Sequence, residues 1–211
     1  MCGILAIIGK GKEEGLVREL SKRMSHRGPD ESDLHVTENG HILSHERLSI
    51  IDLHSGRQPI QGSKTAWMVH NGEVYNHQEL RDGILKHHTF RTKSDSEVIV
   101  HLYEEFGYDF CNMLHGDWAF VIVDGDDYIA GRDPMGVKPI FYAITTRGEL
   151  LVSSEMKSIK GLVSKDVFVQ MLPSGTTLTY DITTGNVETY CYWNPKFYLS
   201  DYTDSKDYDE E

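Results

Sequence analysis

The residue with the clearest potential for chemistry is Cys2, which directly follows the initiator methionine. If Met1 is removed, Cys2 becomes the N-terminal residue and carries a free α-amine, whose reference pKa is near 8. That amine can take the proton of the Cys2 thiol, directly or through a water, so the nucleophile brings its own base and needs no histidine partner. A cysteine at position two can also be an accident beside a buried strand, so Cys2 needs support from the rest of the sequence.

Three further positions carry groups suited to binding charge. Asn71 offers a side-chain N–H₂ and Gly72 an unobstructed backbone N–H, which suit an oxyanion, although Asn-Gly is also a common hairpin turn. Arg47 offers two parallel donors that suit a carboxylate, although an arginine at a strand end is more often a surface charge. Asp95 could accept from an ammonium group, and it equally suits the first turn of a helix.

Other patterns predict no chemistry. All eleven histidines lie between residues 26 and 115, but no Cys-x-x-Cys pair accompanies them, so we expect no metal site. Residues 3–12 are a poor match to a phosphate loop, because five residues separate Gly3 from Gly9 and no Lys-Ser/Thr follows. We interpret Cys111 and Cys191 as buried small apolar residues. Arg132 and Asp133 are interpreted as holding a turn together.

The elements that would position these residues follow from apolar periodicity and turn residues. Helices are expected around residues 16–24 and 76–88, and a third is expected to open at a capping box, Ser94-x-x-Glu97. Strands are expected at residues 3–9, 34–37, 42–51, 65–70, 118–124, 128–131, 140–145, 149–153, 176–181 and 187–192. Helices followed by a run of hairpins indicate an α+β fold with mainly antiparallel sheets.

Seven segments in order strengthen the interpretation of Cys2. They are residues 2–4, 26–30, 45–52, 71–77, 94–97, 131–139 and 153–157. Together they closely resemble the glutaminase domain of the class II glutamine amidotransferases, and specifically that of glutamine-dependent asparagine synthetases. The resemblance covers residues 2 to about 195. It implies an N-terminal-nucleophile hydrolase fold, an αββα sandwich of two mainly antiparallel sheets.

The resemblance also implies an activity and a set of site residues. The chain would hydrolyse L-glutamine to L-glutamate and ammonia through a Cys2 thioester, with nitrogen going to asparagine synthesis. Asn71 and Gly72 would form the oxyanion hole, and Arg47 would bind the substrate carboxylate. The other implied substrate-binding residues are Leu48, Ser49, Ile50 and Ile51, which shape the pocket, and Glu73 and Asp95 near the substrate ammonium.

Composition narrows the class of protein. The chain has 211 residues and a net charge of −12, which argues against a nucleic-acid or anionic-membrane surface. Residues 201–211 hold six acids and one lysine, or −5 of that charge. We expect one glutaminase domain over residues 1–195, and over 196–211 an acidic tail or the start of a linker. Three cysteines and no apolar run of membrane-spanning length predict a cytoplasmic protein in a reducing compartment.

The resemblance further suggests a partner. Asparagine synthetases carry a second domain that activates aspartate with ATP through a Ser-Gly-Gly-x-Asp-Ser loop, and that sequence does not occur here. We therefore expect no cofactor in this chain, with ATP and Mg²⁺ needed only by a synthetase domain or subunit. Two alternatives stay open. One is a free-standing amidotransferase for another acceptor, disfavoured because His45-Glu46-Arg47 replaces the usual His-Thr-Arg; the other is a non-catalytic glutamine-binding module.

Overall fold

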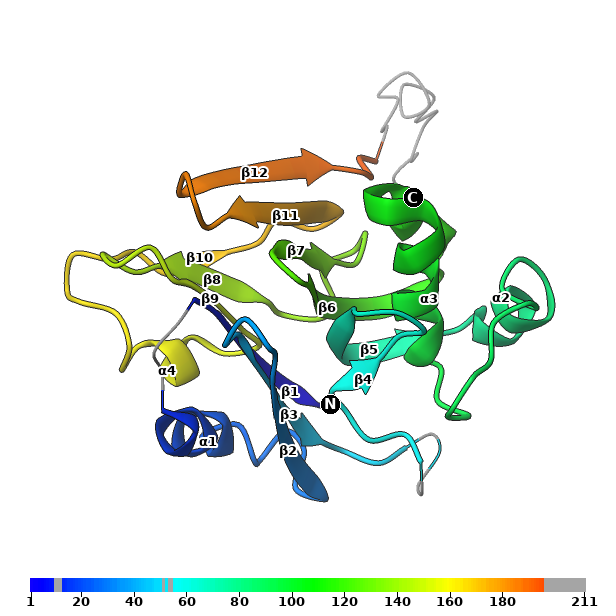
Figure 1. The fold of residues 1–211 in the computed structure, drawn as a ribbon, viewed down its shortest axis with the longest axis horizontal. Helices are drawn as coiled ribbons and strands as arrows, with labels where there is room; N and C mark the ends of the chain where they lie inside the picture. Colours follow the sequence, from blue (N-terminus) through cyan, green and yellow to red (C-terminus); the bar gives the residue numbers. More distant parts are fainter. Residues whose placement is uncertain (10–12, 51, 53–54, 196–211) are drawn as a thin grey trace, which may run out of the picture.

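The computed structural model describes residues 1–9, 13–50, 52 and 55–195, whose strands form two six-stranded sheets with every neighbouring pair antiparallel (Figure 1). The first sheet has the order β10 (Gln170–Met171), β8 (Phe141–Ile144), β9 (Leu150–Ser153), β1 (Gly3–Ile8), β3 (Ile42–Arg47), β2 (Glu31–Val36). The second has the order β12 (Asn186–Cys191), β11 (Thr176–Asp181), β7 (Asp127–Arg132), β6 (Gly116–Asp124), β5 (Trp67–Val74), β4 (Ile60–Gln61). The helices are α1 (Glu14–Lys22), α2 (His77–Asp82), α3 (Glu97–Phe106), the 3₁₀ helix η1 (Gly107–Met113) and α4 (Met156–Ile159).

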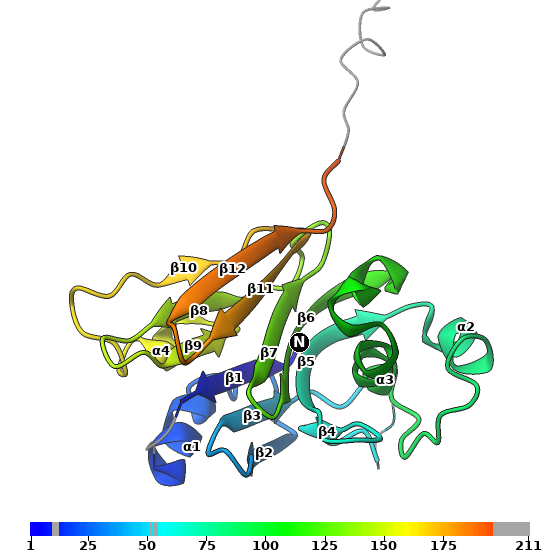
Figure 2. The same ribbon diagram turned by 45° about the horizontal axis from the view of Figure 1, so that its top comes forward.

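Strand alternation divides the core into three layers. In β1, Ile4 and Ala6 point toward the second sheet, whereas Leu5 and Ile7 pack with Val17 of α1. A third layer joins the outer face of the second sheet to α3 and η1. Helices thus cover the outer face of each sheet, with α1 and α4 on the first and α3 on the second (Figure 2). The predicted αββα sandwich is confirmed.

Most predicted strands and the hairpin between β6 and β7 are confirmed, but the helix expected over 76–88 is too long. It is only α2, which ends at Asp82 because the next residue, Gly83, has a φ of −97° and a ψ of −106°, which are not helical. Leu16, the first residue of the helix expected around 16–24, is 40% exposed in α1 and does not join its buried face. The alternative of a hairpin turn at Asn71-Gly72 is excluded, because both residues lie inside β5 and pair with β6.

The capping box is also wrong. The helix begins at Glu97, and Ser96 takes the N-cap position without a side-chain cap hydrogen bond. The Glu97 carboxylate instead accepts from the backbone N–H groups of Arg91 and Thr92, each at 2.8 Å. A buried carboxylate bonded in this way holds the preceding loop rather than the helix end.

Two predictions about the chain's periphery have different outcomes. Cys111 is 1% exposed in the core, as predicted, whereas Cys191 is exposed because β12 is the edge strand of its sheet. The acidic segment 196–211 lies outside the described residues. Among the helices that are described, none is long and apolar enough to cross a membrane.

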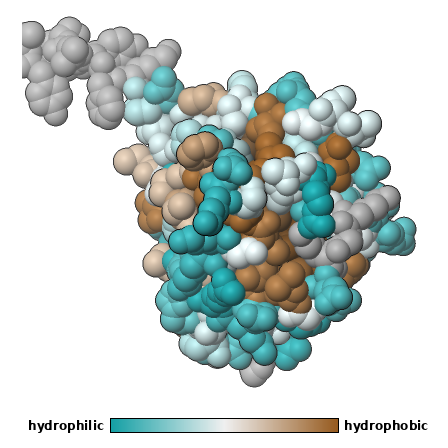
Figure 3. All heavy atoms as spheres, turned by 90° about the vertical axis from the view of Figure 1, so that its left-hand side faces the viewer, coloured by the Kyte–Doolittle hydropathy of each residue, from teal (hydrophilic) through white to brown (hydrophobic). Residues whose placement is uncertain are grey.

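Apolar side chains are also exposed on one side of the molecule. A band of apolar surface runs between polar margins on the face that Figure 3 turns to the viewer. In the stretch from α4 to β10, Met156 is 46% exposed, Phe168 84% and Met171 49%.

Candidate active site

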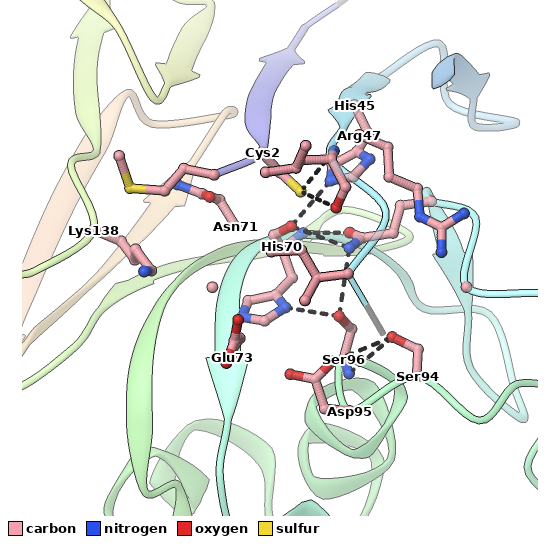
Figure 4. A pocket seen from close by; sticks show the side chains of 16 residues that line it. Cys2, His45, Arg47, His70, Asn71, Glu73, Ser94, Asp95, Ser96 and Lys138 are labelled. Carbon is pink, nitrogen blue, oxygen red and sulfur yellow. Dashed lines mark hydrogen bonds between the residues drawn. The ribbon is translucent and has the colours of Figure 1, made fainter. Parts of the chain in front are cut away.

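The strand alternation that builds the core also brings Cys2 and Asn71 to one place. Cys2 precedes β1 and shares the parity of Ile4 and Ala6, which point toward the second sheet. In β5, Asn71 shares the parity of Val69, which points back toward the first sheet. Both residues line one pocket, whose empty volume including its mouth is about 570 Å³ (Figure 4).

The Cys2 thiol lies against the end of β3. Its Sγ accepts the Leu48 N–H at 3.4 Å and lies 3.7 Å from the Leu48 carbonyl oxygen. Burial raises the pKa of the Cys2 thiol, and the opposing effects of the Leu48 N–H, the N-terminal ammonium and Arg47 do not cancel it. A thiol with a raised pKa needs a nearby base to become a nucleophile. Met1 is 55% exposed and lines the same pocket, so it is accessible for removal.

Asn71 presents an unused amide. Its side chain is fully buried, and neither Nδ2 nor Oδ1 has a hydrogen-bond partner. A buried polar group without a partner costs free energy, so such groups are rare outside functional sites. Figure 4 shows Asn71 projecting from β5 between Cys2 and Lys138. The amide is therefore placed to donate to a ligand beside the Cys2 thiol.

Gly72 is required by the backbone around it. Its φ is +154°, and a Cβ atom there would lie 2.0 Å from the Asp117 carbonyl oxygen and 2.7 Å from Trp118 Cα. Only glycine lets β5 approach β6 this closely beside the pocket. The side chain of Trp118 is completely buried, so the pair Asp117-Trp118 forms the wall behind Gly72.

Arg47 lies in the pocket wall at the end of β3. Its side chain is 5% exposed, its Nη1 donates to Glu31 Oε2 at 2.6 Å, and its Nη2 donates to the Asp52 carbonyl. These contacts fix the plane of the guanidinium. A surface-charge interpretation of Arg47 is therefore wrong.

The other sequence-predicted residues divide between the pocket and its surroundings. Leu48, Ile50, Glu73 and Asp95 line the pocket, and the Asp95 carboxylate accepts the Val74 N–H at 2.7 Å. Ser49 does not line it, and its N–H donates to Asp30. Ile51 lies outside the described residues.

A buried polar network beneath the pocket was missed by sequence reasoning. Gln58 Oε1 accepts the His70 N–H at 2.6 Å, and Gln58 Nε2 donates to the His70 carbonyl at 3.1 Å. His70 Nδ1 lies 2.8 Å from Ser96 Oγ, which ties β5 to the start of α3. No sequence pattern could have paired Gln58 with His70 and Ser96, because the contacts join three separate segments.

His70 and its neighbour His45 are both neutral at pH 7. Burial lowers the pKa of His45 to about 3 and that of His70 to about 4. His45 Nε2 lies 3.2 Å from the His70 carbonyl oxygen, so the proton of His45 is on Nε2. The pocket floor therefore holds polar donors without adding positive charge.

Lys138 supplies a further cation that the sequence analysis did not assign. It lines the pocket, and its Nζ lies 3.9 Å from the Asp117 carboxylate. The Asp133 carboxylate accepts the N–H groups of Val137 and Lys138, each at 2.9 Å, and the Arg132 guanidinium donates to backbone carbonyls nearby. Arg132 and Asp133 hold the turn, as predicted, and the turn presents Lys138.

The assembled groups define what the pocket can bind. A thiol and an unpartnered amide lie together, a fixed guanidinium lies at the wall, and the carboxylates of Glu73 and Asp95 complete the lining. Such a pocket suits a small zwitterion that presents a carbonyl to the thiol.

Comparisons with known proteins agree with this chemistry. The family model of the glutamine amidotransferase domain matches residues 1–190. The chain is 47% identical over 167 residues to asparagine synthetase [glutamine-hydrolyzing] 3 of Arabidopsis thaliana, covering 75% of this chain and 28% of that protein. It is 44% identical over 169 residues to a probable asparagine synthetase of Dictyostelium discoideum, covering 76% of this chain and 30% of that protein. The chain thus spans less than a third of these relatives.

Solved structures share the fold. The glutamine phosphoribosylpyrophosphate amidotransferase from B. subtilis superposes with a TM-score of 0.76 at 18% identity, covering 91% of this chain and 49% of that one. A structure described as the allosteric regulatory enzyme of purine biosynthesis superposes with a TM-score of 0.78, also at 18% identity and with the same coverage.

Proposed function

Because the chain belongs to the class II glutamine amidotransferase domain family, we propose that it hydrolyses L-glutamine to L-glutamate and ammonia with Cys2 as the nucleophile. The observation that carries the proposal is the pairing of Cys2 with the unpartnered, fully buried amide of Asn71 in one pocket. A non-catalytic glutamine-binding module would account for the amide but not for a thiol beside it.

The proposed reaction begins once Met1 is removed. The α-amine of Cys2 takes the thiol proton, and the thiolate attacks the side-chain amide carbon of glutamine. The carbonyl oxygen becomes an oxyanion that receives hydrogen bonds from the Asn71 N–H₂ and the Gly72 N–H. The protonated amine then gives its proton to the departing nitrogen, so ammonia leaves and a Cys2 thioester remains. Water, deprotonated by the same amine, hydrolyses the thioester to glutamate.

The amino-acid head of glutamine would be held by charge. Arg47 would bind the carboxylate, since a planar guanidinium fixed by Glu31 is preorganised for it. Asp95 and Glu73 would accept from the ammonium, and Leu48 and Ile50 would shape the pocket beside the thiol. No metal or organic cofactor has a part in these steps.

We further propose that the ammonia serves asparagine synthesis. The support is that the relatives quoted above are asparagine synthetases named as glutamine-hydrolyzing, of which the chain matches 28–30%. The partner would be an ATP- and Mg²⁺-dependent synthetase domain or subunit. The three free thiols among the described residues accord with a cytoplasmic location.

The test of glutaminase activity measures glutamate released from glutamine by protein whose loss of Met1 has been verified by mass. Cys2→Ala is expected to abolish release while glutamine still binds in isothermal titration calorimetry. The matched control is Cys191→Ala, which removes an exposed thiol on β12. Release by Cys2→Ala at the parent rate would refute the mechanism.

A second test concerns the base. Protein made with an uncleaved residue before Cys2 has an amide in place of the α-amine, so glutamate release is expected to be lost. Full activity of that form would contradict the role of the amine. Supplied with aspartate, ATP and Mg²⁺, the chain alone is expected to make no asparagine, and asparagine formation would overturn the assignment of the synthetase step to a partner.

A further inference from the structure

A second cluster of chemically active side chains lies outside the Cys2 pocket. His88 follows α2, while His101 and Glu104 lie on α3. One ring nitrogen of each histidine and one carboxylate oxygen of Glu104 lie within 4.8 Å of one another. The three residues do not line the Cys2 pocket. The sequence analysis predicted no metal site because no Cys-x-x-Cys pair accompanies the histidines, whereas the fold brings His88 from a separate segment to His101 and Glu104.

Three distances in this cluster are close to those between the ligand atoms of a tetrahedral metal site. Ser63 Oγ lies 3.3 Å from Nδ1 of His88 and 3.3 Å from Nδ1 of His101, and His101 Nδ1 lies 3.0 Å from Glu104 Oε2. Ligand atoms at about 2.0–2.1 Å from a tetrahedral zinc ion lie about 3.3 Å from one another.

A carboxylate stands behind the far nitrogen of each histidine. His88 Nε2 is within hydrogen-bond distance of Glu105 Oε1 at 3.0 Å. His101 Nε2 has no hydrogen-bond partner among the described residues and lies 3.6 Å from Glu97 Oε1. A carboxylate behind the far nitrogen of a ligating histidine is the usual second layer of zinc sites. Glu104 is fixed in turn, because its two oxygens accept the N–H groups of Ser63 and Lys64 at 3.0 and 2.7 Å.

The charge balance also favours a divalent cation. Three carboxylates, those of Glu97, Glu104 and Glu105, lie around two histidines whose neutral forms are ligands. Arg81 lies 3.9 Å from Glu97 and balances that carboxylate. Glu104 and Glu105 therefore carry the negative charge that a cation would balance. Imidazole nitrogens with one carboxylate oxygen suit zinc and its neighbours among the transition metals, rather than magnesium or calcium.

We propose that His88 Nδ1, His101 Nδ1 and Glu104 Oε2 bind one zinc-type transition-metal ion, with the Ser63 hydroxyl or a water as the fourth ligand. The ion links the segment after α2, the loop between β4 and β5, and the middle of α3. The same helix begins next to Asp95 and Ser96 of the Cys2 pocket, so the ion stabilises the element that carries those residues.

The competing interpretation is an ion-pair network without a metal. Burial lowers the pKa of His101, but the carboxylates of Glu104 and Glu97 outweigh it and raise the pKa above its ordinary value. A histidinium between two carboxylates would satisfy the same contacts. The two interpretations differ in whether a stoichiometric ion binds.

The test uses the full chain, made without a histidine tag and stripped of metal. Zinc is titrated against a chromophoric chelator, and one ion per chain is expected to bind. His88→Ala and Glu104→Gln are expected to weaken binding by at least about tenfold, and cobalt bound to the parent is expected to show the visible absorption of tetrahedral coordination. Circular dichroism of each metal-free variant verifies that it is folded.

The controls separate this site from its surroundings. His115→Ala removes an exposed histidine elsewhere and is expected to leave the affinity within about twofold. His87→Ala is expected to weaken binding less than Glu104→Gln, because His87 contacts Glu105 and the ring of His88 but is not itself a proposed ligand. Absence of a stoichiometric ion, unchanged affinity in Glu104→Gln, or a loss in His87→Ala as large as that in Glu104→Gln would each overturn the proposal. None of these readouts depends on glutamine hydrolysis.

Discussion

Asn71 differs from every other asparagine side chain of the described structure in one respect: both of its amide atoms are buried and unbonded. In an ordinary core this arrangement would cost roughly 1–3 kcal/mol. It is explained if the amide is kept for an oxyanion that forms beside Cys2 only during the reaction, since a donor held ready costs no reorganisation at that moment.

Truncation of that side chain is the first prediction. Asn71→Ala is expected to lower kcat for glutamate release by roughly 100- to 1000-fold, the usual loss for one oxyanion donor. KM is expected to change much less, because the donor acts on the transition state. Steady-state kinetics beside Asn112→Ala, an exposed asparagine, checks this. Equal rates for the two variants would contradict the role of Asn71.

The neutral histidines give a second prediction at the residue scale. His70 has a folded pKa of about 4 and an unfolded value near 6.5, so the unfolded chain takes up this proton first as pH falls. The free energy of unfolding is therefore expected to fall by about 1.4 kcal/mol per pH unit for this group between pH 6.5 and 4. Below pH 4 this contribution stops changing.

Urea unfolding at several pH values measures that slope. His70→Gln is expected to show a shallower slope than the parent over this window, whatever its stability at pH 7. Asn112→Ala, at an exposed side chain that does not titrate, serves as the control and is expected to keep the parent slope. A parent-like slope in His70→Gln would show that His70 is not the group that resists protonation.

Among the elements, the pairing of β5 with β6 makes the strictest demand on sequence. Gly72→Ala is expected to lower the free energy of unfolding by more than about 3 kcal/mol, because the new Cβ would overlap the backbone of β6 and the positive φ would be strained. Gly15→Ala on the exposed face of α1 meets no atom within 4 Å and is expected to add up to about 1 kcal/mol. Denaturant titration of both variants tests the contrast; a small loss at Gly72 would contradict it.

The sequence could predict those elements whose apolar alternation or turn residues lie within a short stretch of the chain. The alternation in β1 and the turn residues between β6 and β7 are read from neighbours in the chain. Ser94-x-x-Glu97 was misread locally, because the loop before α3 takes the Glu97 carboxylate, and a local pattern alone would also have made Asn71-Gly72 a hairpin turn, although β6 continues the ladder past Gly72. Local patterns do not show which distant group competes for a donor or acceptor.

For the molecule as a whole, stability depends on the apolar layer between the sheets. Leu43 of β3 is fully buried there, so Leu43→Ala is expected to cost about 2–5 kcal/mol. Leu16→Ala is expected to cost less than about 0.5 kcal/mol, since Leu16 is 40% exposed. Equilibrium unfolding of the two leucine variants distinguishes a layered core from one in which α1 packs through Leu16.

The site as a whole was predictable only in part. The motifs that resemble a known family identified individual site residues, and four of these, Cys2, Arg47, Asn71 and Asp95, line one pocket. The network of Gln58 and His70 was not predicted, because it joins the loop before β4, strand β5 and the start of α3. Such contacts arise from packing, which no short pattern encodes.

The register of β5 has a consequence for how sequences of this kind can diverge. Because successive residues face opposite sides, Asn71 meets the thiol while His70 meets α3. One residue gained or lost between Trp67 and Asn71 would exchange the two faces and send the amide toward the helices. Substitutions along β5 can accumulate as long as the number of residues between Trp67 and Asn71 is kept. An insertion or deletion there would move Asn71 away from the pocket. In descendants of this chain, the length of the segment should therefore persist after its composition has changed.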